Sequence, residues 1–409
     1  MTTIKVRFQP APLPAKEGCI VYQITCKRKS RQVYPGYQVF KHEWDEKSER
    51  LAVPAENARK RLLISIQQQI HLDMKRLSAI IGRLDDSFTD YSADDIVAEF
   101  RRYSEEYSLR SFMKRTISRL SEDGKIRTSE AYLSALSSFS SFLQDMKAEG
   151  RIHSDNLTLD RLDTAMMESY EAWQKKRGNT RNTISFYTRI LRAVYNRAVK
   201  EGAIQDAKPF HTVYTGIDKT IQRALSLAQI KKLRNLNLTD TPELDYARDM
   251  FILCFMLRGM SFIDMAFLRK SDLSDSRITY RRRKTGQLLN IGWTVEMQEI
   301  LEKYPANNTL YLLPIIKEGE TDERHAYRKV ACNINYNLKR IAKMAGINLP
   351  LTLYGARHSW ASAARDKGIP ISVISEGLGH NSEKTTKIYL SRLDITMVDE
   401  ANRMIISCI

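Results

Sequence analysis

Three residues near the end of the chain have the types and the spacing needed to break a phosphodiester bond without water as the nucleophile. Arg357, His380 and Tyr389 occur in this order, and the histidine of a Gly-His pair stands nine residues before the tyrosine (389 − 380). A phenol can attack phosphorus, a planar guanidinium can hold two nonbridging oxygens, and an imidazole can share the developing charge. The pattern predicts a strand-transfer centre acting on DNA, with Tyr389 as the nucleophile.

The reaction also needs groups that move protons. A phenol has a reference pKa of about 10, so Tyr389 must lose its proton to a base or be activated by neighbouring cations during attack. The nearest candidate bases are His380 and Tyr354. The departing deoxyribose oxygen leaves poorly unless it is protonated, and Lys284, predicted at the tip of a β-hairpin, is the candidate proton donor.

The composition points to a polyanionic partner. The chain has 409 residues and a formal net charge of +17, with a pI near 9.5, so nucleic acid is the expected partner. An anionic membrane surface is the alternative, but the sequence has no uninterrupted apolar run of about 18 residues, and no membrane association is expected. The length predicts two or three domains, each with its own core.

Cysteine usage and the N-terminal sequence indicate the compartment. The five cysteines are scattered and never form a CxxC pair, which argues against a disulfide framework or a zinc site and suits a reducing cytoplasm. The start, MTTIKVRFQP, lacks the apolar core of a signal peptide. We therefore expect a cytoplasmic protein associated with the nucleoid.

Residues 1–105 are predicted to form a small module made of a β-hairpin and one long helix. Alternating apolar residues over 18–40 predict two strands joined at a polar corner, and helical spacing predicts a helix from Pro54 to about Leu84. Four basic residues stand at this corner, namely Lys27, Arg28, Lys29 and Arg31. A two-stranded ribbon fits the DNA major groove. A solvated hairpin tip has the same pattern, so both interpretations stay open.

The next block, residues 106–205, is predicted to be helical throughout. Helical periodicity covers residues 108–120, 129–146, 159–176 and 181–201. Thr128 is the expected N-cap of the second segment. The run 177–202 mixes arginines with aromatic residues, which suits a phosphate backbone but is also typical of an ordinary charged helix face. Periodicity lapses over residues 206–222, which are predicted to be a linker.

The third domain, residues 223–409, holds all the candidate reactive residues. Ser226 is the expected N-cap of its first helix, and residues 245–268 have the apolar density of a buried helix pair. Residues 278–293 alternate and turn at Thr285-Gly286, which places Lys284 at a hairpin tip. Two further helices are expected over residues 324–344 and 361–378, on either side of residues 354–358. A short predicted helix over residues 384–390 contains Tyr389, and an amphipathic tail helix is expected from Leu393 to Ile405.

Residues 223–395 resemble the catalytic domain of tyrosine recombinases, the phage-integrase family. Members carry an arginine at the end of a Gly-Leu-Arg-like helix, a hairpin lysine, a His-x-x-Arg box, a Gly-His box, and a tyrosine nine residues later. The match places Lys284, Arg357, His380 and Tyr389 on the family's lysine, second arginine, second histidine and nucleophile. Upstream, residues 106–205 resemble the helical, SAM-like core-site-binding domain and residues 1–105 the arm-binding domain. The resemblance implies a mainly α, three-domain fold with a small antiparallel sheet in the catalytic domain.

Two positions depart from the family pattern. Tyr354 stands where the box begins with histidine, and Ser261 stands where the first arginine belongs. Two substitutes are available: Arg258, about one helical turn before Ser261, and Arg282, two residues before Lys284 and therefore expected on the same strand face. His358, beside Arg357, is expected to be structural. The RGMSF and YGARHSWA segments resemble integrases of conjugative and mobilisable elements of Bacteroides-like bacteria.

The resemblance implies a site-specific recombinase or integrase that forms a 3′-phosphotyrosyl bond at Tyr389. No metal or nucleotide cofactor is expected, because the sequence has no Walker-type loop and no carboxylate cluster for two-metal chemistry. The expected partners are double-stranded DNA at core and arm sites, three further protomers in a tetramer joined by the tail, and a host DNA-bending factor. The alternatives are a DNA invertase with the same chemistry, a type IB topoisomerase, and a DNA-binding regulator that has lost catalysis.

Overall fold

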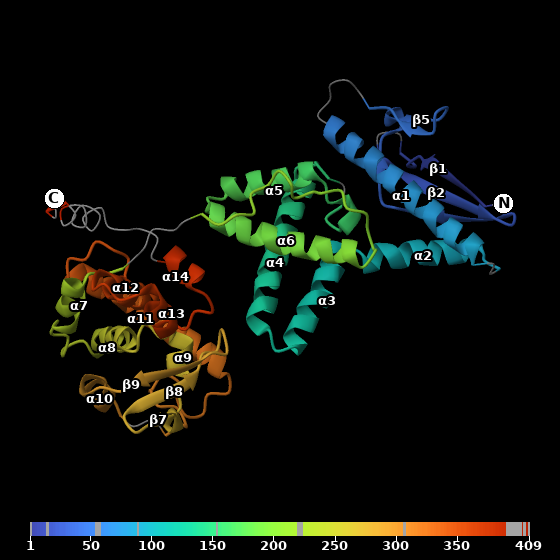
Figure 1. Cartoon of the computed structure of the whole chain (residues 1–409). Helices are drawn as coiled ribbons and strands as arrows, with labels where there is room; N and C mark the ends of the chain where they lie inside the picture. The colour runs from blue at the N-terminus through green and yellow to red at the C-terminus, as the bar shows by residue number, and fades with distance from the viewer. Residues whose placement is uncertain are drawn as a thin grey trace. The chain divides into compact units, whose positions relative to one another are not determined.

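The structure consists of two compact units, Met1–Lys219 (unit 1) and Thr220–Ile409 (unit 2) (Figure 1). The computed structural model describes residues 2–13, 16–53, 59–87, 90–152, 154–218, 224–305 and 308–389, together with residues 403, 406 and 407. Helices predominate in both units, and the sheets are small and antiparallel, so the predicted mainly α fold class is confirmed. No helix among the described residues is long and apolar enough to cross a bilayer.

Residues 2–106 of unit 1 form an N-terminal module in which a four-stranded antiparallel sheet packs against helices. The strand β2 buries Ile20, Tyr22 and Ile24 in a core shared with the first helix. Helix α1 lies along the sheet (Figure 1). The predicted hairpin is present: β2 and β3 join at Lys27 and Arg28, whose φ angles of 47° and 65° suit a two-residue turn. The elements of the module are β1 (Thr3–Gln9), β2 (Gly18–Cys26), β3 (Lys29–Val33), β4 (Gln38–Val39), the pair β5 (Trp44–Asp45) and β6 (Arg50–Leu51), α1 (Lys60–Asp86) and α2 (Ala93–Glu106).

Strand β1 and helix α2 of this module are not predicted from the sequence pattern, and neither is the β5–β6 pair. Strand β1 pairs with β2 along its whole length and supplies an edge of the sheet. Helix α2 begins at a capping box, in which the Ser92 hydroxyl accepts a hydrogen bond from the Asp95 amide and the Asp95 carboxylate accepts one from the Ser92 amide. The predicted start of the long helix at Pro54 lies outside the described residues.

The helical module, residues 107–218, contains four α-helices around its own core. They are α3 (Leu109–Glu122), α4 (Ile126–Ala148), α5 (Thr164–Lys176) and α6 (Arg181–Lys200). The prediction that Thr128 caps the second helix is wrong, because α4 begins at Ile126, three residues before the predicted start at Ser129, with Lys125 at the cap position. Phe210 and Val213 pack into the same core, so part of the predicted linker belongs to this module.

The basic and aromatic residues of the run 177–202 are largely engaged within the module. Arg177 stacks on Trp173, Arg181 stacks on Tyr214, and Tyr195 lies in the core. These contacts fix the guanidinium groups near the surface, because a cation held over a ring gains electrostatic attraction from it. The run is therefore a structured surface of α6 and its flanks.

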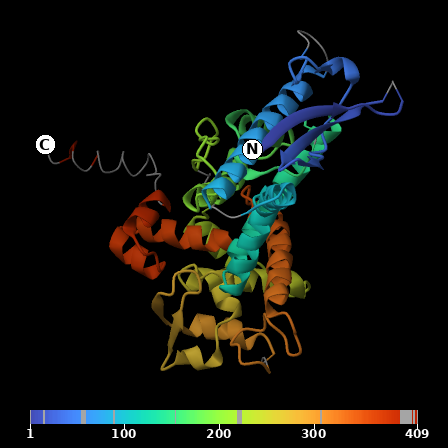
Figure 2. The same cartoon turned by 90° about the vertical axis from the view of Figure 1, so that its right-hand side faces the viewer.

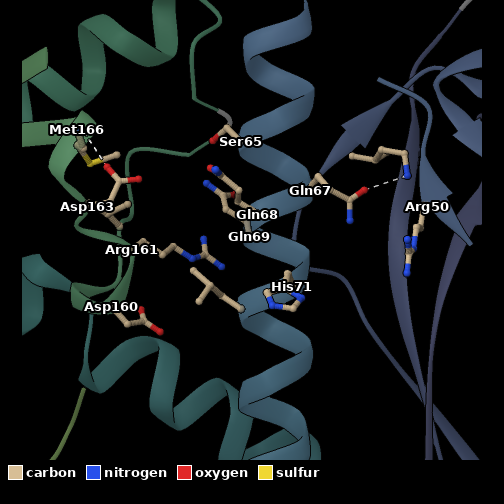
Figure 3. Close-up of a pocket in the computed structure, with 13 residues that line it drawn as sticks. Arg50, Ser65, Gln67, Gln68, Gln69, His71, Asp160, Arg161, Asp163 and Met166 are labelled. Atoms are coloured by element: carbon tan, nitrogen blue, oxygen red, sulfur yellow. Dashed lines mark hydrogen bonds between the residues drawn. The ribbon is translucent and has the colours of Figure 1, made fainter. Parts of the chain in front are cut away.

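A buried charge network joins the N-terminal and helical modules within unit 1. Arg161 donates to Asp73 of α1 (2.9 Å) and to the Tyr37 hydroxyl (2.7 Å), and Tyr22 and Tyr37 each donate to the other Asp73 oxygen (2.8 Å each). Arg161 extends from the helical module toward α1 beside a cavity of about 770 Å³ (Figure 3). Because buried charges are stable only when paired, this network fixes how α1 meets residues 157–163, the segment before α5.

In the described part of unit 2, the strands form a three-stranded sheet in the order β7-β8-β9, and the other elements are helices. Helix α8 packs against α11 and α12, and the sheet lies at one end of the unit, away from α12 (Figures 1 and 2). The elements are α7 (Leu227–Arg234), α8 (Pro242–Met256), α9 (Phe262–Ala266), β7 (Leu273–Ser274), β8 (Arg277–Arg281), β9 (Leu288–Gly292), α10 (Val295–Glu302), α11 (Glu323–Met344), α12 (Leu353–Asp366), α13 (Ile371–Gly377) and α14 (Glu383–Tyr389).

Several sequence predictions for unit 2 can be compared with these elements. The Ser226 cap is confirmed, since its hydroxyl accepts from the amide of Gln229 (3.2 Å). The prediction that residues 354–358 lie between two helices is wrong, because they lie within α12. The helix predicted over residues 361–378 is divided between α12 and α13, which are separated at Gly368 to Pro370. The predicted tail helix falls mainly on residues outside the described part of the chain.

Candidate active site

Five separate segments of unit 2 carry the candidate reactive residues, and one of them is helix α14 with Tyr389. Arg357 lies in the first turns of α12, His380 follows α13, and Arg282 and Lys284 lie in the turn between β8 and β9. Arg258 lies in the turn between α8 and α9. The structure brings Arg357, His380 and Arg282 together at residues 378–380.

Arg357 is the most constrained of these side chains, with 4% of its surface exposed. Its Nη1 donates to the Gly259 carbonyl (2.9 Å), and its Nη2 donates to the Leu378 carbonyl and lies 3.1 Å from His380 Nε2. A Cβ on Gly259 would lie 2.5 Å from Arg357 Cα, and the φ of Gly259 is +68°. Glycine is therefore required there both for the left-handed backbone and for the close approach of α12.

His380 lies between Arg357 and helix α14. Its Nδ1 is 2.9 Å from the Thr386 hydroxyl, and its backbone amide donates to the Ser375 carbonyl of α13. Burial lowers the pKa of His380 to about 4, and the positive charges of Arg357, Arg282 and Lys284 add to this effect. The ring is therefore neutral at pH 7 and can accept a hydrogen bond or a proton.

The structure separates the two candidate substitutes for the first arginine. Arg282 is 7% exposed and donates through Nη1 to the Gly379 carbonyl, next to His380. The expectation that it shares a strand face with Lys284 is wrong, because β8 ends at Arg281, and the turn buries Arg282 while exposing Lys284. Gly379 has a φ of +63°, and a Cβ there would lie 3.2 Å from Arg282 Cδ.

Arg258 does not reach this cluster through a helical turn, because α8 ends at Met256 and Arg258 has a φ of +58°. Its side chain runs past α13, with Cδ 3.7 Å from the position a Gly377 Cβ would take. Its charge is not among those that lower the pKa of His380. Of the two arginines, Arg282 is the one whose charge acts on the His380 ring.

Ser261 and Asp264 connect the helical part of unit 2 to the hairpin. The Ser261 hydroxyl donates to Asp264 Oδ2 (2.6 Å), and Asp264 Oδ1 accepts from the Arg283 amide (2.9 Å). Asp264 is buried, so this carboxylate fixes the backbone next to Arg282. Asp264 is a site residue that the sequence motifs above do not include, although a Ser-x-x-Asp spacing at a helix start is a recognisable capping signal.

Tyr354 and His358 lie on the same face of α12, one turn apart. Their rings contact edge to face with centroids 4.9 Å apart, and Tyr354 is 56% exposed. His358 therefore packs against the residue that replaces the family's box histidine. Tyr389 is the last residue of α14, and its side chain lies outside the described part of the structure.

Two family models match this chain, one within unit 1 and one over most of unit 2. The phage integrase SAM-like domain matches residues 108–214, and the phage integrase family matches residues 223–394. The chain belongs to the phage integrase family. This membership supports site-specific DNA recombination chemistry for the chain.

Curated relatives of this integrase-family chain are distant in sequence, and their alignments cover more of each relative than of this chain. Tyrosine recombinase XerD of Listeria innocua is 24% identical over 273 residues, covering 64% of this chain and 86% of the relative. Tyrosine recombinase XerA of Thermococcus kodakarensis is 24% identical over 223 residues, covering 53% of this chain and 72% of the relative.

Solved structures share the fold of this integrase. A lambda integrase dimer bound to a COC′ core site covers 93% of this chain and 96% of its own, with 14% identity and a TM-score of 0.53. A singly substituted fragment of the Tn1549 transposon integrase, in complex with a circular intermediate DNA, covers 73% of this chain and 99% of its own, with 14% identity and a TM-score of 0.52.

Proposed function

We propose that this protein cleaves and rejoins DNA strands through a 3′-phosphotyrosyl bond at Tyr389. The observation that carries the proposal is the convergence of Arg357, Arg282 and His380 around the turn at residues 378–380, with the α14 helix of Tyr389 directly following. Fixed cations in a partly buried site stabilise charge on a pentacoordinate phosphate far better than mobile surface cations. Bond energy is conserved in the phosphotyrosyl bond, so the proposed reaction requires no metal and no nucleotide.

Each residue has a distinct proposed role. Arg357 holds nonbridging oxygens of the phosphate, and Arg282 supplies the charge of the family's missing first arginine. His380, neutral at pH 7, accepts a hydrogen bond or the tyrosine proton. Lys284 is exposed on the hairpin turn and can reach the leaving deoxyribose oxygen as proton donor. Tyr354 presents a hydroxyl at the protein surface beside this site.

The proposed DNA contacts extend over the whole chain. Residues 1–105 bind arm sites through the basic β2–β3 hairpin, residues 106–205 bind core sites, and residues 206–222 connect them to the catalytic domain, 223–409. The exposed Lys27, Arg28 and Lys29 at the hairpin support the first role. We further propose a homotetramer on DNA, assisted by a host DNA-bending factor, in the nucleoid of the cytoplasm. The RGMSF and YGARHSWA segments support an integrase of a Bacteroides-type mobile element.

A suicide DNA substrate tests the nucleophile. A nicked duplex that releases a short fragment on cleavage traps the covalent complex, which migrates slowly on a denaturing gel. We expect trapping by the wild type and none by Tyr389→Phe, with site binding unchanged, because the substitution removes only the hydroxyl. Equal trapping by both proteins would exclude Tyr389 as the nucleophile.

A matched pair of alanine variants tests the arginine. Arg282→Ala is expected to lower the cleavage rate by about 10²- to 10³-fold, the typical cost of one transition-state charge donor. Arg258→Ala serves as the control, and cleavage within a few fold of wild type is expected. The reverse result would indicate that Arg258 replaces the family's first arginine. Normal cleavage by both variants would contradict the proposal that either arginine replaces it.

Two further experiments separate the rival functions. A supercoiled plasmid without a recombination site is expected to stay supercoiled, and efficient relaxation would instead indicate a type IB topoisomerase. A DNA-binding regulator would bind its site but form no covalent complex with the suicide substrate. An invertase has the same chemistry, so the DNA flanking the gene distinguishes the two. A neighbouring attachment site would indicate a mobile element, and inverted repeats around a promoter would indicate an invertase.

A further inference from the structure

The buried hydroxyl of Thr386 links His380 to the helix of the proposed nucleophile. Thr386 lies in α14 three residues before Tyr389, which is about one helical turn, and its side chain is 0% exposed. Its Oγ1 is 2.9 Å from His380 Nδ1. The neighbouring Thr385 is exposed and its hydroxyl contacts Ser382 instead, at 3.3 Å.

The contacts of His380 determine which ring nitrogen carries the proton. A guanidinium has only donors, so His380 Nε2, 3.1 Å from Arg357 Nη2, must act as the acceptor. In the neutral ring the proton then resides on Nδ1, which donates to Thr386 Oγ1. The lone pair on Nε2 is thereby directed toward the arginine that is proposed to hold the phosphate.

We propose that Thr386 is a positioning residue that keeps His380 in its Nδ1–H tautomer and holds α14 at the turn formed by residues 378–380. This inference rests on the proposed function of His380 and Tyr389. Without the hydroxyl, a buried N–H loses its acceptor, and the ring can rotate or change tautomer. The same loss frees the helix that carries the nucleophile from its contact with the site.

The substitutions Thr386→Val and Thr386→Ser separate hydrogen bonding from packing. Valine keeps the shape and removes the hydroxyl, whereas serine keeps the hydroxyl and removes a methyl group. We expect Thr386→Val to slow suicide-substrate cleavage by about 10- to 100-fold, with DNA binding unchanged, and Thr386→Ser to stay within about threefold of wild type. Thr385→Val is the matched control on the same helix and is expected to cleave normally. A packing role predicts the opposite order for the valine and serine variants and would overturn the proposal.

Nitrogen-15 NMR of the histidine rings provides a readout that needs no catalysis. In the full-length protein at pH 7, the His380 signals, assigned with His380→Gln, are expected to show a protonated Nδ1 and an unprotonated Nε2. Thr386→Val is expected to shift them toward exchange between the two tautomers, while Thr385→Val leaves them unchanged. A protonated Nε2 in the wild type, or no change in Thr386→Val, would refute the inference.

The failure of this inference is distinguishable from the failure of the proposed function. If covalent trapping does not depend on Tyr389, the proposed function fails, whatever Thr386 does. If trapping depends on Tyr389 and Thr386→Val cleaves like the wild type, only the role of Thr386 fails.

Discussion

Gly259→Ala tests whether the close approach of the α8–α9 turn to α12 sets the position of Arg357. An alanine at a φ of +68° costs about 1–2 kcal/mol in backbone strain. Its Cβ would also lie 2.5 Å from Arg357 Cα, roughly 1 Å inside ordinary contact, and such overpacking costs about 1–3 kcal/mol. The expected loss in free energy of unfolding of unit 2 is therefore about 2–5 kcal/mol.

Gly368→Ala is the matched control for this substitution. Gly368 has a φ of +73°, close to that of Gly259, but a Cβ there would meet no atom within 4 Å. Only the strain of about 1–2 kcal/mol is expected in this variant. The difference between the two variants therefore isolates the contact with Arg357.

Two measurements follow the effect of Gly259→Ala. Hydrogen exchange of α12 peptides over a urea series reports the stability of unit 2 separately from unit 1. Single-turnover cleavage of a suicide substrate, at a temperature where both variants are folded, is expected to fall about 10²-fold, because the backbone of Arg357 moves by roughly 1 Å. If Gly259→Ala matches Gly368→Ala in stability and cleaves like the wild type, the close approach does not position Arg357.

Three further outcomes are expected. Arg161→Met should destabilise unit 1 by about 3 kcal/mol, because it removes one partner of the buried Asp73. Arg181→Met, which breaks an exposed ion pair, should cost less than about 1 kcal/mol. Equal urea midpoints for the two variants would contradict this difference. The lowered pKa of His380 gives stability that is complete above about pH 6.5 and is lost as the pH falls toward 4. His380→Gln should therefore flatten the pH dependence of the free energy of unfolding in that window, by up to about 3 kcal/mol before solvent screening reduces the effect. An unchanged pH profile would refute this prediction. Ser226→Ala should lower the stability of unit 2 by about 1 kcal/mol in thermal unfolding, and no change would show that this cap is dispensable.

The predictions that agree with the structure depend on short-range pattern. The β2–β3 hairpin, the helices of the helical module and the Ser226 cap follow from alternation, periodicity and capping residues within a few positions of each other. The wrong or missing elements depend on context. Strand β1 is stabilised by pairing with β2, and the start of α4 lies ahead of Thr128 because residues 126–128 continue the helix.

The choice of substitute arginine shows the limit of spacing arguments. Arg258 stands one turn before Ser261 only if the helix continues, but α8 ends at Met256. Arg282 shares a face with Lys284 only if the strand continues, but β8 ends at Arg281. In both cases a chain reversal redirects the side chain, and sequence distance no longer measures direction.

The sequence by itself determined the residue types of the site, their order, and the spacing of His380 and Tyr389, because these depend on local chain geometry and on which side chains can hold or attack a phosphate. Only the tertiary structure decided that Arg282 donates to the Gly379 carbonyl next to His380, that the Gly259 and Leu378 carbonyls hold Arg357, and that Thr386 contacts the His380 ring. The physical reason is that Gly259 and Arg282 meet residues about a hundred positions away only when α8, the hairpin and α12 pack around one core. Such packing is set by the burial of the whole unit and not by any local spacing.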